Sequence, residues 1–215
     1  MKERGMIFNA EMVRAILDGR KTQTRRPFNW KRQPAMEMAE RDDGSLWPWA
    51  EDCERGGDIW FACPFGEVGD RIWVRETFRV HSRATDVATL VYRASVRNSW
   101  TEQTHRVPVV VCDKPATPEK WTPSIHMPRW ASRILLEITD VRVERLQGIS
   151  QRDAIAEGGP SDHPSFSKIS REMGFSDWPR SWFAQTWWGI YGREAWDANH
   201  WVWVIEFRRI EGGAA

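Results

Sequence analysis

Hydrophobic and polar positions first alternate with the period of a helix near the start of the chain. One apolar stripe follows the three- and four-residue spacing of a helix face: Val13, Ile16 and Leu17. Asn9 before the stripe is a good N-cap, and Gly19 stands where a helix commonly ends. The pattern predicts a short strand over Met6 to Phe8 and a helix from Asn9 to about Asp18.

Further along, alternation and apolar runs are typical of strands. They predict strands at 71–80, 89–95, 134–143 and 201–210. Ser150 followed by Asp153 predicts a capped helix that ends at Gly158, and Pro179 opens another helix. Strands outnumber helices and the two alternate irregularly. This order favours an α+β fold with a small barrel over a doubly wound sheet.

Three long segments lack a sustained period. Residues 29–68 carry eight acids between Glu37 and Asp58, with apolar anchors that indicate a packed loop. The proline-rich stretch at 97–128 predicts an ordered loop with short extended pieces, and 159–176 predicts another loop.

Composition narrows the class of protein. The chain has 215 residues, a net charge of +1 and three cysteines, with no apolar run of transmembrane length. The first ten residues lack the apolar region of a secretory signal, and the sparse cysteines fit a reduced cytoplasmic compartment. Neither the cysteines nor the histidines have a convincing metal-ligand spacing, so we expect no metal and no cofactor.

The most informative segment is the basic run that follows the first helix, Gly19-Arg20-Lys21-Thr22-Gln23-Thr24-Arg25-Arg26. Taken on its own, it reads either as a solvated basic loop or as an anion-binding platform with a hydroxyl placed inside it. The chain lacks both the glycine-rich dinucleotide fingerprint and the phosphate-binding P-loop.

This Gly-x-Lys-x-x-Thr-x-Arg pattern resembles the signature of the ASCH family. The segments Gly69 to Glu76 and Ile134 to Gly158 resemble the barrel strand and the late strand and helix of that family. Ser124 to Arg133 is similar to longer ASCH proteins of phages and prophages. The resemblance implies a single PUA-like domain over 1–215, a β-barrel with flanking helices and insertions at 29–68, 97–123 and 159–180.

Some small ASCH proteins remove the acetyl group from N(4)-acetylcytidine with a Lys, a Thr and a Glu. The resemblance maps these roles onto Lys21, Thr24 and Glu76. Amide hydrolysis needs a nucleophile, a base and a group that stabilises the oxyanion. Lys21 would serve as the base for Thr24 if burial or nearby Arg side chains lower its pKa. Glu76 would orient Lys21, protonate the leaving nitrogen, or simply hold Lys21 in a salt bridge.

Other basic and aromatic residues are candidates for binding a modified nucleoside or RNA or DNA: Arg20, Arg25, Arg26, Arg75, Ser124, His126, Arg129 and Trp130. The favoured function is an amidohydrolase of an acylated cytidine. The alternatives are a nucleic-acid-binding module that reads a base, a ribonuclease that uses the same basic site, and an accessory protein whose partner is another protein.

Overall fold

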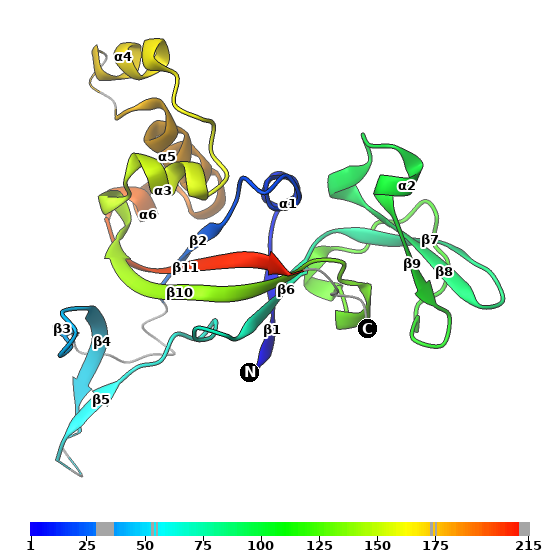
Figure 1. Ribbon diagram of the computed structural model, residues 1–215, viewed down its shortest axis with the longest axis horizontal. Coiled ribbons are helices and arrows are strands. Elements are labelled where there is room, and N and C mark those ends of the chain that lie inside the picture. The colour runs from blue at the N-terminus through cyan, green and yellow to red at the C-terminus, as the bar shows by residue number, and fades with distance from the viewer. Residues whose placement is uncertain (29–36, 53, 55, 173, 175, 211–215) are drawn as a thin grey trace. The chain divides into compact units, whose positions relative to one another are not determined.

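The structure is a computed structural model that describes residues 1–28, 37–52, 54, 56–172, 174 and 176–210. The α-helices are α1 (Ala10–Leu17), α2 (Trp100–Gln103), α3 (Gln151–Ala156), α4 (Pro164–Glu172), α5 (Trp178–Tyr191) and α6 (Arg193–Asp197) (Figure 1). The strands are β1 (Glu3–Ile7), β2 (Gln23–Pro27), β3 (Glu37–Glu40), β4 (Leu46–Glu51), β5 (Asp58–Trp60), β6 (Arg71–Arg75), β7 (Phe78–Arg83), β8 (Val87–Tyr92), β9 (Thr104–Pro108), β10 (Leu135–Arg145) and β11 (Trp201–Ile210). The predicted α+β class is confirmed by these elements.

The chain divides into two compact units. Unit 1 comprises 1–19, 69–137 and the segment from 208 onward, and unit 2 comprises 20–68 and 138–207. The largest sheet has the strand order β1-β6-β10-β11-β2, and the long strands β10 and β11 have residues in both units. The prediction of a single domain over 1–215 stays a prediction.

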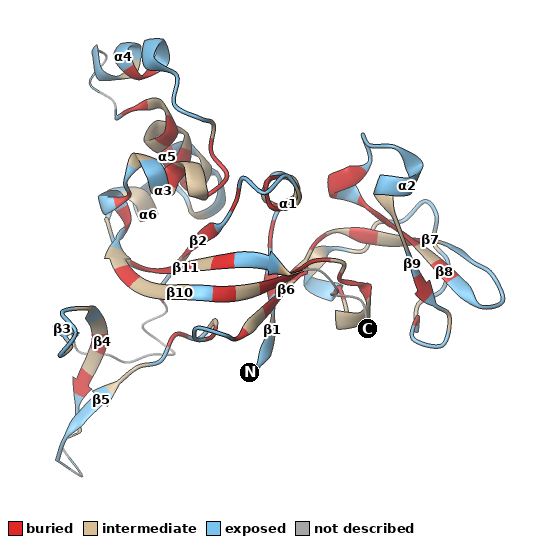
Figure 2. Cartoon of the chain, viewed as in Figure 1, coloured by how far each residue is buried: buried red, intermediate tan, exposed pale blue. Residues whose placement is uncertain are grey.

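Unit 1 contains a parallel pair and an antiparallel sheet. β1 runs parallel to β6, and the start of β10 pairs antiparallel with β6. β7, β8 and β9 form a three-stranded antiparallel sheet, which lies beside α2 in Figure 1. A cluster of buried side chains that includes Phe78, Leu90, Tyr92 and Met127 forms the core beneath it. Figure 2 shows the buried positions along β7 and β8.

Unit 2 pairs β2 antiparallel with β11 and packs helices on one face of this pair. The apolar cluster between them joins Phe183 and Trp187 of α5 to Val202 and Val204 of β11. Burying such aromatic side chains removes about 150–250 Å² of surface each, so α5 anchors this face. The helices α3 to α6 gather in one group in Figure 1.

Short-range signals are confirmed at two helix starts. The Asn9 side chain accepts a hydrogen bond from the Met12 N–H at 2.8 Å, and the Ser150 side chain accepts one from the Asp153 N–H at 3.1 Å. Gly19 has φ +74° and Gly158 has φ +96°, the left-handed conformation that favours glycine after a helix. Strand β11 has the predicted bounds.

The predicted strand at 71–80 is wrong, because the structure contains two strands there. β6 pairs with β1 and β10, whereas β7 pairs with β8, and Glu76 and Thr77 separate them. Alternate burial continues across the break, from Ile72 to Val80. Periodicity alone therefore could not reveal the change of partner.

Two segments predicted as loops contain regular elements. β3, β4 and β5 form an antiparallel sheet within 29–68, of which 29–36, 53 and 55 lie outside the described residues. Helix α4 lies within 159–176, and its half-polar sequence has no long apolar stripe. The predicted strand at 89–95 ends at Tyr92, where a 3₁₀ turn over Arg93–Ser95 follows.

Candidate functional site

The basic motif forms the centre of a buried polar cluster in unit 2. Lys21 makes an isolated antiparallel bridge with Glu157, and the Thr22 N–H donates to the Ala156 carbonyl at 2.9 Å. On the other side of the chain, the Phe207 N–H donates to the Thr22 carbonyl at 2.8 Å. These bonds hold the motif between β11 and the end of α3.

Lys21 is almost fully buried, with 2% of its surface exposed. Its Nζ donates to the Glu157 carboxylate Oε2 at 2.6 Å and to the Glu157 backbone carbonyl at 2.8 Å. Burial lowers the pKa of Lys21, because desolvation outweighs the opposing pull of the Glu157 carboxylate, and Arg25 and Arg26 lower it further. A lowered pKa is the direction that a catalytic base at Lys21 requires, and the catalytic role itself stays a prediction.

Arg25 lies on the same face of β2 as Gln23 and has a side chain with no exposed surface. Its Nη2 donates to Glu144 Oε2 at 2.7 Å and to Asp153 Oδ2 at 3.3 Å. Its Nη1 lies 3.5 Å from Glu157 Oε1, and its guanidinium carbon lies 5.8 Å from the centroid of the Phe183 ring.

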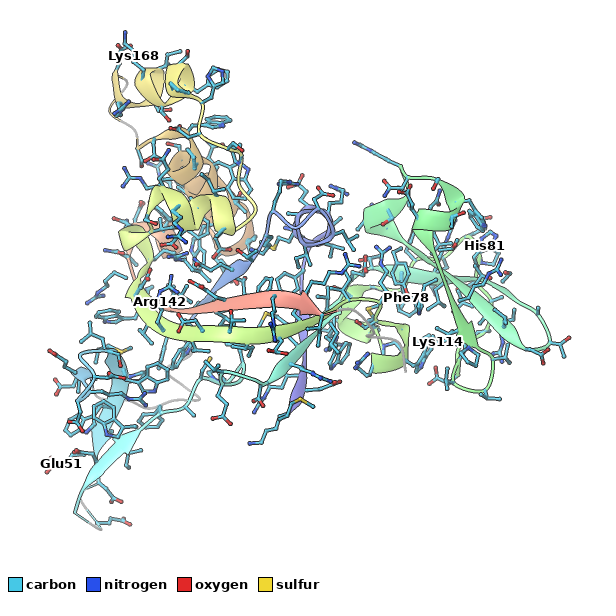
Figure 3. The ribbon with its side chains drawn as sticks, in the orientation of Figure 1. Glu51, Phe78, His81, Lys114, Arg142 and Lys168 are labelled. Atoms are coloured by element: carbon cyan, nitrogen blue, oxygen red, sulfur yellow. The ribbon has the colours of Figure 1, made fainter. Side chains whose placement is uncertain are left out.

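Arg142 on β10, labelled in Figure 3, extends the cluster with further acids. Its ion-pair partners are Asp140 at 2.9 Å, Glu144 at 2.6 Å, Asp153 at 3.5 Å and Glu206 at 2.6 Å. Its Nη2 also donates to Gln23 Oε1 at 3.3 Å. These bonds raise the pKa of Arg142 above its already high ordinary value, against the effect of burial.

Thr24 is buried on β2 opposite Ile205. Since side chains alternate along a strand, Thr24 and Arg26 leave β2 on the face opposite Gln23 and Arg25. Arg26 pairs in register with Trp203, which stacks on Phe28 with ring centroids 5.4 Å apart. In the motif's first turn, Arg20 donates to the Gly158 carbonyl at 2.9 Å.

Glu76 lies in unit 1 and has a different partner from the one expected. Both of its carboxylate oxygens accept from Arg133, Oε1 from Nε at 2.9 Å and Oε2 from Nη2 at 3.1 Å. The acidic partner of Lys21 is Glu157, where the sequence analysis expected Glu76. A catalytic role for Glu76 stays a prediction, and its described contacts are those of a structural ion pair.

The second predicted group also lies in unit 1. Arg75 donates to the backbone carbonyls of Ser124 and Ile125 and so holds the short 3₁₀ turn Ser124–His126. Arg129 donates to the Glu3 carboxylate at 2.9 Å. His126 is exposed, whereas Trp130 is half-buried with its ring edge-on to Phe78. The structure therefore brings Arg75 to the turn that contains Ser124 and His126. Arg129 and Trp130 make separate contacts, with Glu3 and Phe78.

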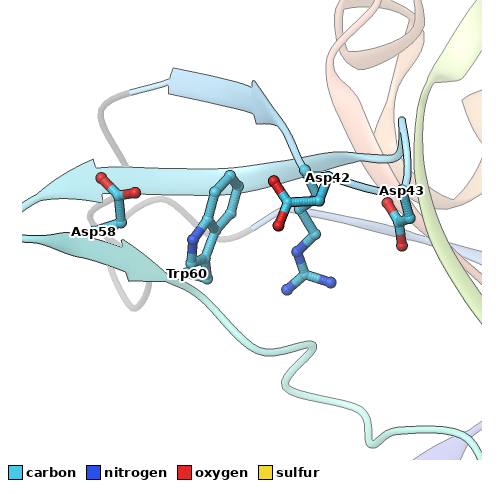
Figure 4. Close-up of a pocket in the computed structure, with 5 residues that line it drawn as sticks. Asp42, Asp43, Asp58 and Trp60 are labelled. Atoms are coloured by element: carbon cyan, nitrogen blue, oxygen red, sulfur yellow. The ribbon is translucent and has the colours of Figure 1, made fainter.

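The β3–β5 sheet carries an open hollow of about 410 Å³, lined by Arg41, Asp42, Asp43, Asp58 and Trp60 (Figure 4). The Arg41 guanidinium carbon lies 4.0 Å from the Trp47 ring centroid and 5.4 Å from that of Trp60. The Arg41 guanidinium thus covers the ring faces of Trp47 and Trp60 beside the hollow.

Within the described ranges, no group of three or more His, Cys, Asp or Glu side chains could hold a metal ion. Cys63 and Cys112 are buried, and Cys53 lies outside the described residues. In the same part of the chain, no helix has both the length and the apolar character needed to cross a membrane.

Sequence reasoning missed most of the acidic half of the cluster. Asp153 and Glu157 are four residues apart, so they share a face at the end of α3 beside Lys21. That spacing was readable in the sequence, because the helix from Ser150 to Gly158 was predicted. By contrast, Glu144, Arg142 and Glu206 come from β10 and β11, and no local pattern connects them with the motif.

The chain was compared with solved structures, with protein-family models and with curated proteins. The chain is similar to the crystal structure of an ASCH domain from Lactobacillus crispatus JV V101, with 13% identity and a TM-score of 0.32, over 97% of this chain and 79% of that chain. No protein-family model matches the chain, and no curated protein does.

Proposed function

We propose that the chain is an amidohydrolase that removes an acyl group from a cytidine-like base, with the Lys21–Glu157 pair as its proton-transfer group. The observation that carries the proposal is the buried 2.6 Å hydrogen bond between Lys21 Nζ and Glu157 Oε2, together with the lowered pKa of Lys21. A lysine with a lowered pKa has a larger neutral fraction near neutral pH, so it accepts a proton more readily. Glu157 fixes the direction of the amine.

In the proposed reaction, neutral Lys21 accepts a proton from a water molecule that attacks the acyl carbonyl. The proton then passes to the exocyclic nitrogen, which leaves as the amine, and the acyl group leaves as the carboxylic acid. The resemblance assigned the attacking oxygen to Thr24. We assign it to water, because Thr24 leaves β2 on the face opposite Gln23 and Arg25.

The ribonuclease alternative fits the cluster less well. Lys21 and Arg25 are ion-paired with Glu157, Glu144 and Asp153, so their positive charge is already offset within the protein. A phosphate would approach several carboxylates there, and like charges repel. A neutral amide meets no such repulsion.

The test is turnover of N(4)-acetylcytidine, followed by chromatography of cytidine. General acid–base catalysis is worth about 10²–10⁴-fold, so Lys21→Ala is expected to lower kcat/KM by at least about 100-fold. Lys168→Ala, at an exposed lysine of α4, is the matched control and should keep the wild-type rate. With Lys21 as the base, wild-type kcat/KM rises with pH through the lowered pKa of this lysine and levels off below the pH expected for its ordinary pKa of 10.5.

Three results would count against this assignment. Absence of cytidine from folded wild-type protein would overturn the amidohydrolase, and steeply salt-dependent RNA binding would then favour the nucleic-acid-binding module. A loss of turnover in Thr24→Ala that Thr24→Ser restores would return the nucleophile to Thr24. Wild-type turnover in Lys21→Ala would remove Lys21 as the base.

A further inference from the structure

Several polar atoms of the buried cluster have no hydrogen-bond partner among the described residues. They are Gln23 Nε2, Arg25 Nε, Arg25 Nη1 and Glu157 Oε1, of which the last two face each other as an ion pair at 3.5 Å without forming a hydrogen bond. The three residues are 1%, 3% and 4% exposed, so bulk water does not solvate these atoms. Folded proteins pair nearly all buried polar groups, and buried orphans of this kind call for a specific explanation.

The orphaned amino group of Gln23 has a fixed direction. Arg142 Nη2 donates to Gln23 Oε1 at 3.3 Å, and an arginine can only donate. The oxygen must therefore face Arg142, which leaves Nε2 as the unused donor. Gln23 and Arg25 are two residues apart on one face of β2, a separation of about 7 Å that one planar base can span.

The charges around these atoms favour a neutral ligand. The ion-pair network joins the cations Lys21, Arg25 and Arg142 to the carboxylates of Asp140, Glu144, Asp153, Glu157 and Glu206. Carboxylates outnumber cations in this network, so an anionic ligand is disfavoured. The orphaned set offers donors from Gln23 and Arg25 and an acceptor from Glu157, which complements a carbonyl and an N–H on one edge of a base.

We infer that Gln23, Arg25 and the second oxygen of Glu157 form a specificity edge that reads a neutral acylated pyrimidine. The Gln23 and Arg25 donors bind the ring carbonyl, and Glu157 Oε1 accepts from the N–H of the acylamino group. This inference rests on the proposed amidohydrolase for its substrate, but the orphaned atoms are independent of the proton-transfer role of Lys21.

The test compares two free bases, N(4)-acetylcytosine and 4-acetamidopyrimidine, of which the second keeps the amide but lacks the ring carbonyl. A site built to bond a carbonyl discriminates against an analogue without it, because the buried donors are then left unpaired. We expect wild-type protein to prefer N(4)-acetylcytosine by about tenfold or more in kcat/KM. Gln23→Leu should reduce this preference to within about threefold and act mainly by raising KM.

Two further variants separate the loss of the Gln23 donor from an unspecific effect of substituting a glutamine. Gln23→Glu retains the oxygen that Arg142 bonds but replaces the donor, so it should lose the preference as Gln23→Leu does. The control is Gln147→Leu, because Gln147 is exposed in the same unit and its Nε2 already donates to the Trp196 carbonyl at 2.9 Å. This control should keep the wild-type preference.

Equilibrium titration with cytidine separates this inference from the proposed function. If wild-type protein hydrolyses the substrate but Gln23→Leu and Gln23→Glu keep the preference, the specificity edge is wrong and the amidohydrolase stands. If wild-type protein hydrolyses neither compound but binds cytidine about tenfold more tightly than Gln23→Glu does, the edge stands and the amidohydrolase is wrong. If folded protein neither binds cytidine nor hydrolyses either compound, both are wrong.

Discussion

Two buried ion pairs, Lys21–Glu157 in unit 2 and Glu76–Arg133 in unit 1, are alike in burial but differ in how completely their polar atoms are bonded. Each nitrogen at the end of the Arg133 side chain donates a hydrogen bond, to Glu76, to the Ser95 hydroxyl or to the Glu102 carbonyl. In the Lys21–Glu157 cluster, Arg25 donates only through Nη2, and Glu157 Oε1 accepts none among the described residues.

The residues around the two pairs also differ in how completely their polar atoms are bonded. The Arg133 guanidinium carbon lies 4.0 Å from the Tyr92 ring centroid, and the Tyr92 hydroxyl donates to the Ala131 carbonyl at 2.7 Å. The described neighbours of this pair in unit 1 therefore bond each terminal nitrogen of Arg133. The cluster around Lys21 keeps donors and an acceptor without a hydrogen-bond partner among the described residues, and the proposed specificity edge would use them. Completeness of bonding, more than burial or charge, separates a structural pair from a candidate site.

Turnover gives the largest expected difference between the two pairs. Glu157→Gln removes the charge that holds Lys21 and should lower kcat/KM for N(4)-acetylcytidine by about 100-fold, within the range of general acid–base catalysis. Glu76→Gln, assayed at a temperature where it is folded, should stay within about threefold of wild type. Both rates are measured as cytidine released. A 100-fold loss in Glu76→Gln with an active Glu157→Gln would restore the role that the sequence analysis gave to Glu76.

The sequence was a good guide where bonds are local. Asn9 and Ser150 cap the helices that they were predicted to cap, and β11 has the predicted bounds, because each depends on residues within a few positions. The motif identified Lys21 as the candidate base. Burial contributes most to the lowered pKa of Lys21, and the neighbouring Arg26 and Arg25 of the basic run lower it further.

The acidic partner was beyond this kind of reasoning. Glu76 follows the β6 sequence that resembles the family, whereas Glu157 is separated from Lys21 by 136 positions. The choice between them depends on which strand and helix end pack against the motif. The division of 71–80 into β6 and β7 has the same origin, because alternate burial persists while the pairing partner changes.

Stability gives the next largest expected effect, and we test it on the Glu76–Arg133 pair. Removing one partner of a buried ion pair leaves the other charge without compensation, at a cost of about 3–5 kcal/mol. We expect Glu76→Ala to lower the free energy of unfolding by about 3 kcal/mol, measured by urea denaturation. Glu102→Ala is the control, because the Glu102 side chain only caps α2 at Ser99 and should cost about 1 kcal/mol. Equal losses in the two variants would show that Glu76–Arg133 does not stabilise unit 1.

The smallest expected effect is the pH dependence of stability that Glu76 contributes. Burial raises the pKa of Glu76 above its ordinary value of 4.5, although Arg133 acts in the opposite direction. The folded chain therefore holds this proton more tightly than the unfolded chain does. The resulting stability is fully present below 4.5 and is lost as the pH rises through the raised pKa, with a slope of at most about 1.4 kcal/mol per pH unit for one proton.

Urea unfolding of wild type and Glu76→Gln between pH 4.5 and pH 7 measures this slope. The window starts at 4.5 because that is the ordinary pKa of a glutamate. The wild-type free energy of unfolding, relative to that of Glu76→Gln, should fall as the pH rises across this window. A relative stability that instead rises with pH would mean that Arg133 outweighs burial. Arg133 would then hold Glu76 in its charged form across this pH window. The Lys21–Glu157 and Glu76–Arg133 pairs would in that case differ only in how completely their polar atoms are hydrogen-bonded.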